Sequence, residues 1–178
     1  MSDRPGNKYD CAAAMKRLSE GDQTALAVLY DLLGKPMYAL AYTILKNPTD
    51  AEDALQDAFL KILRGASGYR DDGNARAWAM SVARNSAIDL LRRRQKETAE
   101  DGEVLDSLSR EGDFAESYAE ADKMNRLLAI LDGTDRDIVV LKAVDGFKFR
   151  EIAGIVGITA EAARKRYSRA IKKLRAAY

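Results

Sequence analysis

Histidine is absent from this 178-residue sequence, and cysteine occurs only once, as Cys11. The first absence removes the commonest general base and metal ligand, and the second excludes thiolate metal clusters and an internal disulfide. A phosphate-binding glycine loop, a glycine-flanked nucleophilic serine and a paired-carboxylate motif are missing too. We therefore expect no catalysis, no metal and no cofactor, and we interpret Cys11 as a small packing residue without a redox role.

Long apolar runs are also missing from the sequence. No stretch approaches the roughly 20 apolar residues that a helix needs to cross a bilayer. The first residues read MSDRPG and lack the charged-then-apolar layout of a signal peptide. These two absences predict a cytoplasmic protein that does not insert into a membrane by itself.

The formal net charge is only +1, but the charged residues are unevenly distributed. Residues 1–96 hold 15 basic and 12 acidic side chains, residues 97–122 hold 1 and 10, and residues 123–178 hold 13 and 6. Basic side chains bind phosphates, whereas an acidic segment is repelled by them. The pattern therefore predicts two modules that face nucleic acid and a connector that does not.

Apolar residues recur at helical spacing along the chain, without β alternation, and make up 47% of it. The sequence predicts an all-α fold of two small helical domains, over residues 8–96 and 122–178. The connector at 97–121 has too few apolar side chains to fold alone and is expected to be mostly flexible. Helices are expected over residues 9–19, 23–45, 50–64, 75–95, 123–131, 135–144, 149–156 and from 160 onward, with a loop at 65–74.

Local signals define several of these helix ends. The predicted N-caps are Asp22, Thr134 and a capping box formed by Thr49 with Glu52. Gly34 and Pro36 are expected to bend or interrupt the second helix, because proline cannot donate a backbone hydrogen bond.

The last two predicted helices form a helix-turn-helix pattern. Gly157 breaks the chain between them, and Thr159 caps the second helix. The second helix buries one stripe, made of Ala163, Tyr167, Ala170, Ile171 and Leu174. Seven basic and no acidic side chains lie between positions 164 and 175. A solvated basic helix is the simpler interpretation, but the preceding turn favours a helix that reads a DNA groove.

The predicted helix at 50–64 has two distinct sides. Its packed side holds Ala51, Leu55, Ala58, Phe59, Ile62 and Leu63. The other side carries Asp53, Gln56, Asp57 and Leu60. A leucine among acidic and amide groups indicates a protein-contact face, although acidic residues near a helix start also favour the helix dipole. The spacing alone leaves both interpretations open.

The predicted helix at 75–95 also presents two surfaces. Met80, Ala87, Ile88 and Leu91 define its packed side, and a separate stripe holds Trp78, Val82, Asn85 and Asp89. Its basic end, Arg92 to Arg94 with Lys96, suits phosphate but also the negative end of the helix dipole. Trp78 is the only tryptophan and is interpreted either as core or as a stacking surface for an unpaired base.

These motifs resemble those of a known family. Residues 50–60, DAEDALQDAFL, resemble the core-polymerase-binding helix of bacterial sigma factors, and residues 78–92, WAMSVARNSAIDLLR, resemble the promoter-melting and minus-ten helix that follows it. The segment from Glu151 to Ala170 is similar to the minus-thirty-five-reading module. With two modules and a short linker, the chain most resembles the extracytoplasmic-function (ECF) group of the sigma-70 family.

The resemblance implies a non-catalytic subunit that positions core RNA polymerase on promoter DNA and opens it. The residues that it places on the clamp helices of the largest polymerase subunit are Asp53, Gln56, Asp57 and Leu60. Those that it places on minus-ten DNA, partly through a base-holding loop at 67–74, are Tyr69, Arg70, Asn74, Trp78, Asn85, Arg92 and Arg93. Those that it places on minus-thirty-five DNA are Glu161, Arg164, Lys165, Arg166, Ser168, Arg169 and Lys172. It also implies contact with the flap of the second-largest subunit and control by an anti-sigma factor.

The sequence departs from the family pattern at several positions. Ala162 and Ala163 stand where threonine and valine are usual, and Lys148 stands where a capping serine or threonine is common. Tyr167 and Ser168 replace the more frequent leucine and histidine, which leaves the preferred promoter sequence undefined. Two other classes stay open: a helix-turn-helix regulator that binds DNA without engaging polymerase, and a polymerase-binding antagonist that has lost promoter function.

Overall fold

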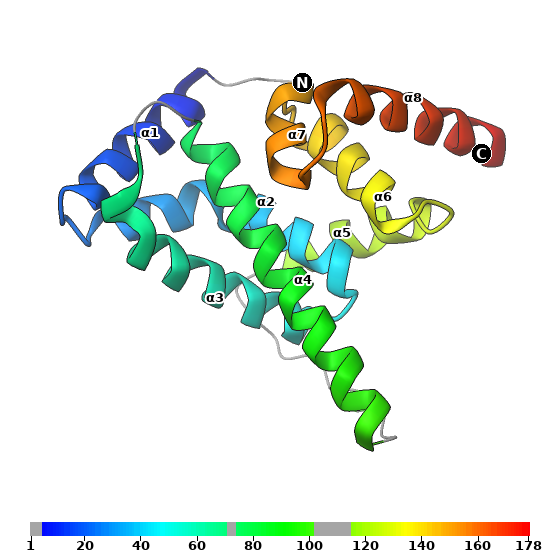
Figure 1. The fold of residues 1–178 in the computed structure, drawn as a ribbon, viewed down its shortest axis with the longest axis horizontal. Coiled ribbons are helices and arrows are strands. Elements are labelled where there is room, and N and C mark those ends of the chain that lie inside the picture. Colours follow the sequence, from blue (N-terminus) through cyan, green and yellow to red (C-terminus); the bar gives the residue numbers. More distant parts are fainter. Residues whose placement is uncertain (1–4, 71–73, 102–114) are drawn as a thin grey trace.

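The structure of the protein, a computed structural model, describes residues 5–70, 74–101 and 115–178. Within these ranges every regular element is helical, which confirms the all-α prediction (Figure 1). The elements are α1 (Pro5–Ser19), α2 (Ala25–Leu45), α3 (Pro48–Gly65), the 3-10 turn η1 (Ala66–Gly68), α4 (Ala75–Asp101), α5 (Ala115–Leu127), α6 (Gly133–Val139), the π-helical turn η2 (Val140–Val144), α7 (Phe149–Val156) and α8 (Ala160–Ala177).

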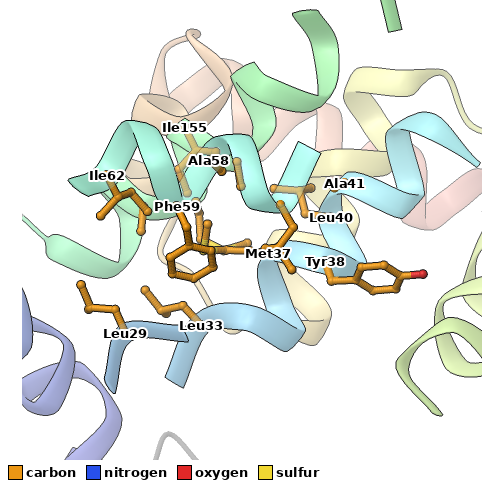
Figure 2. Packing of buried hydrophobic residues seen from close by; sticks show 14 of the residues in the cluster. Leu29, Leu33, Met37, Tyr38, Leu40, Ala41, Ala58, Phe59, Ile62 and Ile155 are labelled. Atoms are coloured by element: carbon orange, nitrogen blue, oxygen red, sulfur yellow. The ribbon is translucent and has the colours of Figure 1, made fainter. Parts of the chain in front are cut away.

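Helices α1 to α4 form the N-terminal module, whose core is built from the apolar sides of α2 and α3. Leu29, Leu33 and Met37 of α2 are fully buried, as is Ile62 of α3 (Figure 2). Removing an aliphatic side chain of this size from water stabilises a fold by about 1.5–3 kcal/mol. Cys11 is buried in the same core, in agreement with its predicted packing role.

α2 is not interrupted at Gly34 and Pro36, and the predicted cap of α3 is wrong. α2 continues past both residues, and Gly34 is buried against the bundle, so tertiary packing outweighs the local break signal. α3 is capped by Asn47, whose side-chain oxygen accepts a hydrogen bond from the Asp50 N–H at 3.0 Å. Pro48 then occupies the first turn, which needs no backbone donor. The expected cap, Thr49, lies inside the helix instead.

The acidic connector is helical at both of its ends. α4 runs on to Asp101, and α5 already begins at Ala115, so residues 97–101 and 115–121 of the expected connector are helical. Good helix formers such as Glu97, Ala99 and Glu100 explain the continuation of α4. The rest of the connector, residues 102–114, lies outside the described residues.

Helices α6 to α8 form the C-terminal module and contain the predicted helix-turn-helix. The α6 cap is Asp132, which accepts from the Asp135 N–H at 2.8 Å, and not the expected Thr134. The turn between α7 and α8 matches the prediction: Gly157 has a left-handed φ of 79°, and the Thr159 hydroxyl accepts from the Ala162 N–H at 3.1 Å. The buried stripe of α8 is also confirmed, because Ala163 and Ala170 are fully buried.

Alanine substitutions at Gly154 of α7 and at Gly157, its C-cap, are expected to change the free energy of unfolding in opposite directions. Gly157→Ala should lower the free energy of unfolding by about 1–2 kcal/mol, because a Cβ is disfavoured at positive φ. Gly154 lies in the exposed helix interior with no atom within 4 Å of an added Cβ, so Gly154→Ala should raise it by about 0.5–1 kcal/mol. Urea unfolding of both variants measures the difference, and equal effects would contradict the described turn.

Candidate functional site

The face of α3 that points away from the core is exposed, as predicted. Asp53 and Gln56 are exposed and Leu60 retains 49% of its accessible surface. Asp57 forms an ion pair with Lys61 at 2.8 Å, one helical turn away. The face therefore combines negative charge with an uncovered leucine, a composition that suits a protein partner.

Tyr30 of α2 lies beside this exposed surface, although its spacing in the sequence does not predict it. Its ring lies 5.1 Å from the ring of Phe59, the neighbour of Leu60, and it is 36% exposed, as is Val28 of the same helix. The sequence of α2 is apolar on most sides, so periodicity alone does not separate its few exposed positions from its core.

Trp78 lies at the N-terminal half of α4 and is only partly exposed. Its ring is 5.5 Å from the ring of Tyr69, and a Cβ added at Gly65 would meet it at 3.5 Å. Trp78 and Val82, which share the second predicted stripe of this helix, are both partly buried against the core, whereas Asn85 and Asp89 of the same stripe are exposed. Alanines at 75, 79, 83 and 87 are buried and allow α4 to approach its neighbours closely.

Asn74 caps α4 and links it to α7. Its Oδ1 accepts from the Ala77 N–H at 3.2 Å, and its Nδ2 donates a hydrogen bond to the Glu151 carboxylate. Asn85, Arg92 and Arg93 are exposed farther along α4. Both arginines lie in the C-terminal half of α4, whose last turns project beyond the rest of the molecule (Figure 1).

The outer face of α8 gathers the predicted groove-reading side chains. Its exposed members are Glu161, Arg164, Lys165, Ser168, Arg169 and Lys172. The Arg164 guanidinium lies 5.7 Å from the Phe149 ring centre, and Lys165 pairs with Glu161 at 2.7 Å. Because this pair is largely exposed, it contributes little stability and leaves both groups available to a ligand.

Arg166 differs from the other predicted DNA residues of α8. Its Nε donates to Asp135 at 2.7 Å, and its terminal nitrogen donates to Asp132 at 3.2 Å. The hydrogen bond from the Asp135 N–H, followed by the charge of Arg166, holds the pKa of Asp132 below its usual value. Arg166 thus ties α8 to the start of α6, a role that sequence periodicity does not reveal.

The two modules contact each other along α4. The partly buried Arg84 and the buried Asp137 form an ion pair at 2.9 Å. Arg76 donates to the Asp145 carbonyl at 2.8 Å and stacks over the Phe147 ring at 4.2 Å. A cleft of about 520 Å³ separates α4 from α7 beside these contacts; it is lined by Asn74, Ala77, Trp78, Ser81, Lys148, Arg150, Glu151, Gly154 and Ile155.

Two carboxyls at this contact are unusually weak acids. Burial raises the pKa of Asp137 to about 6 against the opposing charge of Arg84, with smaller influences from Arg136 and Asp132. Burial also raises the pKa of Asp145 to about 7, again against an arginine, Arg76. Ionisation of these two groups therefore costs free energy in the folded chain.

The raised pKa values predict a pH effect on stability. A carboxyl whose folded pKa exceeds its unfolded value stabilises the fold fully below the unfolded pKa and loses that contribution as pH rises through the folded pKa. Relative to Asp137→Asn, the parent should therefore lose unfolding free energy between pH 4 and about 7. Thermal or urea unfolding of both proteins over this range measures the difference. A constant difference would contradict the raised pKa of Asp137.

None of the helices in the described part of the chain combines the length and the apolar character that a bilayer crossing requires. The same residues contain no group of three or more cysteine, aspartate or glutamate side chains placed to hold a metal ion.

Comparison with protein families matches both modules. Residues 29–97 match Sigma-70 region 2, and residues 121–174 match Sigma-70, region 4. The RNA polymerase sigma factor CarQ of Myxococcus xanthus is 31% identical, covering 90% of this chain and 93% of its own. The ECF RNA polymerase sigma factor SigK of Mycobacterium ulcerans is 26% identical, covering 98% and 97%.

Solved structures agree in fold. CnrH, in complex with the cytosolic domain of CnrY, superposes with a TM-score of 0.71 at 24% identity, over 94% of this chain and 96% of its own. The sigma factor RpoE of Bartonella quintana, in complex with the anti-sigma factor NepR, gives 0.66 at 24% identity, over 83% and 94%. Two matched regions in the family's order, together with the full-length likeness to CarQ, show that the chain belongs to the ECF sigma factors of the sigma-70 family, which bind core RNA polymerase and direct it to promoters.

Proposed function

We propose that the exposed face of α3 is the surface through which this chain binds core polymerase. Asp53, Gln56 and Asp57 would meet the clamp helices of the largest subunit, with Leu60 packed beside them. The observation that carries the proposal is Leu60, which is half exposed on a helix whose opposite side already supplies the core. An uncovered leucine beside two carboxylates contributes little to the isolated fold.

We further propose that α4 and α8 read the two promoter elements. At the minus-ten element, Tyr69 and Trp78 offer stacking surfaces for an unpaired base, with Arg70 and Asn74 beside them, and the remaining contacts come from Asn85, Arg92 and Arg93. At the minus-thirty-five element, the base-edge and groove residues are Glu161, Arg164, Lys165 and Ser168, and the phosphate residues are Arg169 and Lys172. Arg166, bound to α6, holds the reading helix in position.

We propose that the chain acts without catalysis and without a cofactor, in the cytoplasm, where polymerase and promoter DNA are found. The C-terminal module would also sit on the flap of the second-largest polymerase subunit. Control by an anti-sigma factor is supported by the fold neighbours, since RpoE of Bartonella quintana was solved in complex with one.

Family membership decides against the regulator that binds DNA without polymerase. Binding experiments distinguish the two classes directly. The chain mixed with core polymerase should co-elute as one complex on size exclusion, and this complex should retain promoter duplex that the free chain binds poorly. Failure to co-elute, combined with tight duplex binding by the free chain, would overturn the proposed contact with polymerase.

A further inference from the structure

Arg164, which we assign to base reading on α8, lies against an aromatic ring of the preceding helix. Its guanidinium carbon is 5.7 Å from the centre of the Phe149 ring, within the roughly 6 Å over which a ring face attracts a cation. The next residue, Lys165, is held differently, by its ion pair with Glu161 at 2.7 Å. Arg164 is therefore exposed to a ligand but has a preferred resting place on α7.

The Phe149 ring is itself held by its neighbours. Phe149 is the first residue of α7 and is partly buried against the apolar core. Tyr167 of α8 meets the ring edge to face, with the ring centres 5.7 Å apart and the planes at 64°. Nζ of Lys142 lies 5.0 Å from the centre of the same ring and donates to the Phe147 carbonyl at 3.2 Å. The ring thus gives Arg164 a fixed surface and not a mobile one.

A fixed surface matters because guanine recognition depends on orientation. Arginine reads guanine by two parallel hydrogen bonds to O6 and N7, which form together only if the guanidinium plane is aligned with the base edge. An exposed arginine populates many rotamers, and ordering one of them upon binding costs entropy. A guanidinium that stacks on a ring is already restricted, while its edge N–H groups stay free for the base. Preorganisation by Phe149 therefore favours the bidentate contact.

Tyr167 distinguishes this arrangement from the usual family pattern, in which leucine is more frequent at this position. The positive edge of a tyrosine ring is attracted to the negative face of Phe149, an interaction that leucine cannot make. Tyr167 also lies three residues after Arg164 on α8, so the two side chains are neighbours on the helix surface. The aromatic pair and the arginine therefore form one continuous group.

We propose that Phe149 and Tyr167, here called the aromatic platform, are positioning residues that orient Arg164 toward a guanine of the minus-thirty-five element and so set the specificity at that base pair. The inference rests on the proposed base-reading role of Arg164. Neither platform residue needs to touch DNA. The platform adds a contribution from α7, the first helix of the helix-turn-helix, to a readout otherwise assigned to α8 alone.

Substitutions that keep or remove the ring test the platform. Phe149→Leu keeps an apolar side chain at this partly buried position but removes the ring, Phe149→Tyr keeps the ring, and Tyr167→Leu removes its support. Each variant is bound to core polymerase, and the probe is the minus-thirty-five duplex that the parent holoenzyme selects from a randomised pool. Competition with duplexes changed at one base pair at a time measures the discrimination at every position.

An exposed cation–π contact is worth about two- to fivefold in affinity, so Phe149→Leu should lower discrimination by that factor. The loss should fall on the guanine pair that Arg164→Ala also affects, and not on the others. Tyr167→Leu should lose less at the same pair, and Phe149→Tyr should match the parent. A merely structural role of Phe149 would instead weaken binding to all duplexes alike.

A double variant separates positioning from packing. In the Arg164→Ala background, Phe149→Leu should cause no further loss of discrimination, because the ring has no guanidinium left to orient. The matched control is the Arg169→Ala background, in which Phe149→Leu should keep its full effect, since Arg169 is assigned to phosphate. Circular dichroism confirms that the helices of each variant are intact, and Tyr167→Leu remains informative if Phe149→Leu fails to fold.

The proposal is overturned if Phe149→Leu leaves discrimination unchanged while Arg164→Ala lowers it, or if Phe149→Leu lowers the affinity for every duplex equally. A further loss of discrimination in the Arg164→Ala background would overturn it too. If Arg164→Ala itself leaves discrimination unchanged, that result contradicts the proposed base-reading role of Arg164, and the inference falls with it.

Discussion

Reversing the charges of Asp53 and Asp57 together is expected to lower the affinity for core polymerase by about 100-fold, close to 3 kcal/mol, since removing one hydrogen-bonded charge from an interface costs about 2–5 kcal/mol. Both side chains lie on the outer face of α3 and contribute nothing to its core. The ion pair between Asp57 and Lys61 is exposed, so its loss should change the unfolding free energy by less than about 1 kcal/mol. Fluorescence anisotropy with labelled chain and purified core polymerase measures the affinity.

The matched control for this variant reverses two exposed acids elsewhere, Asp10→Lys with Glu20→Lys. It changes the net charge by the same amount but leaves the α3 face intact. If control and test variants lose affinity equally, the effect is one of overall charge, and the α3 face is not the polymerase contact.

Alanine substitutions at Arg164 and Arg169 are expected to weaken DNA binding in different ways, although both are exposed arginines of α8. Arg164→Ala should weaken binding to the preferred minus-thirty-five sequence by about 1–3 kcal/mol and relax discrimination at one or two base pairs, as loss of a bidentate base contact does. Arg169→Ala should weaken all sequences alike and reduce the salt slope by about one unit, as loss of one phosphate contact does.

Both arginine variants are measured as holoenzymes on promoter and scrambled duplexes over a range of salt concentrations. Alanine favours the helix at both positions, so the comparison is not biased by helix stability. An equal loss on both duplexes for Arg164→Ala would remove it from base reading and leave α8 as an electrostatic clamp.

Local signals in the sequence predicted the elements that depend on near neighbours. The two sides of α3, the buried stripe of α8 and the turn at Gly157 and Thr159 follow from spacing and from backbone preferences that act within a few residues. The sequence does not identify the N-caps of α3 and α6, because several residues able to cap a helix stand side by side at each start. In the structure the caps are Asn47 and Asp132.

The rest of the candidate site depends on residues far apart in the chain. Arg166 meets Asp135 across 31 positions, and Arg84 meets Asp137 across 53. Asn74 reaches Glu151 across 77. No periodicity in a single helix encodes such pairs, because they arise only when helices that are distant in the chain pack together. The same packing partly buries Val82.

Transcription in vitro determines whether this chain programs core RNA polymerase. Purified core polymerase would be incubated with genomic promoter fragments, with and without the chain, and the 5′ ends of the transcripts would be sequenced. We expect a defined set of start sites that appears only with the chain, each preceded by the same minus-ten and minus-thirty-five elements. This set should be lost when the charges of Asp53 and Asp57 are reversed. Identical transcripts with and without the chain would contradict this expectation.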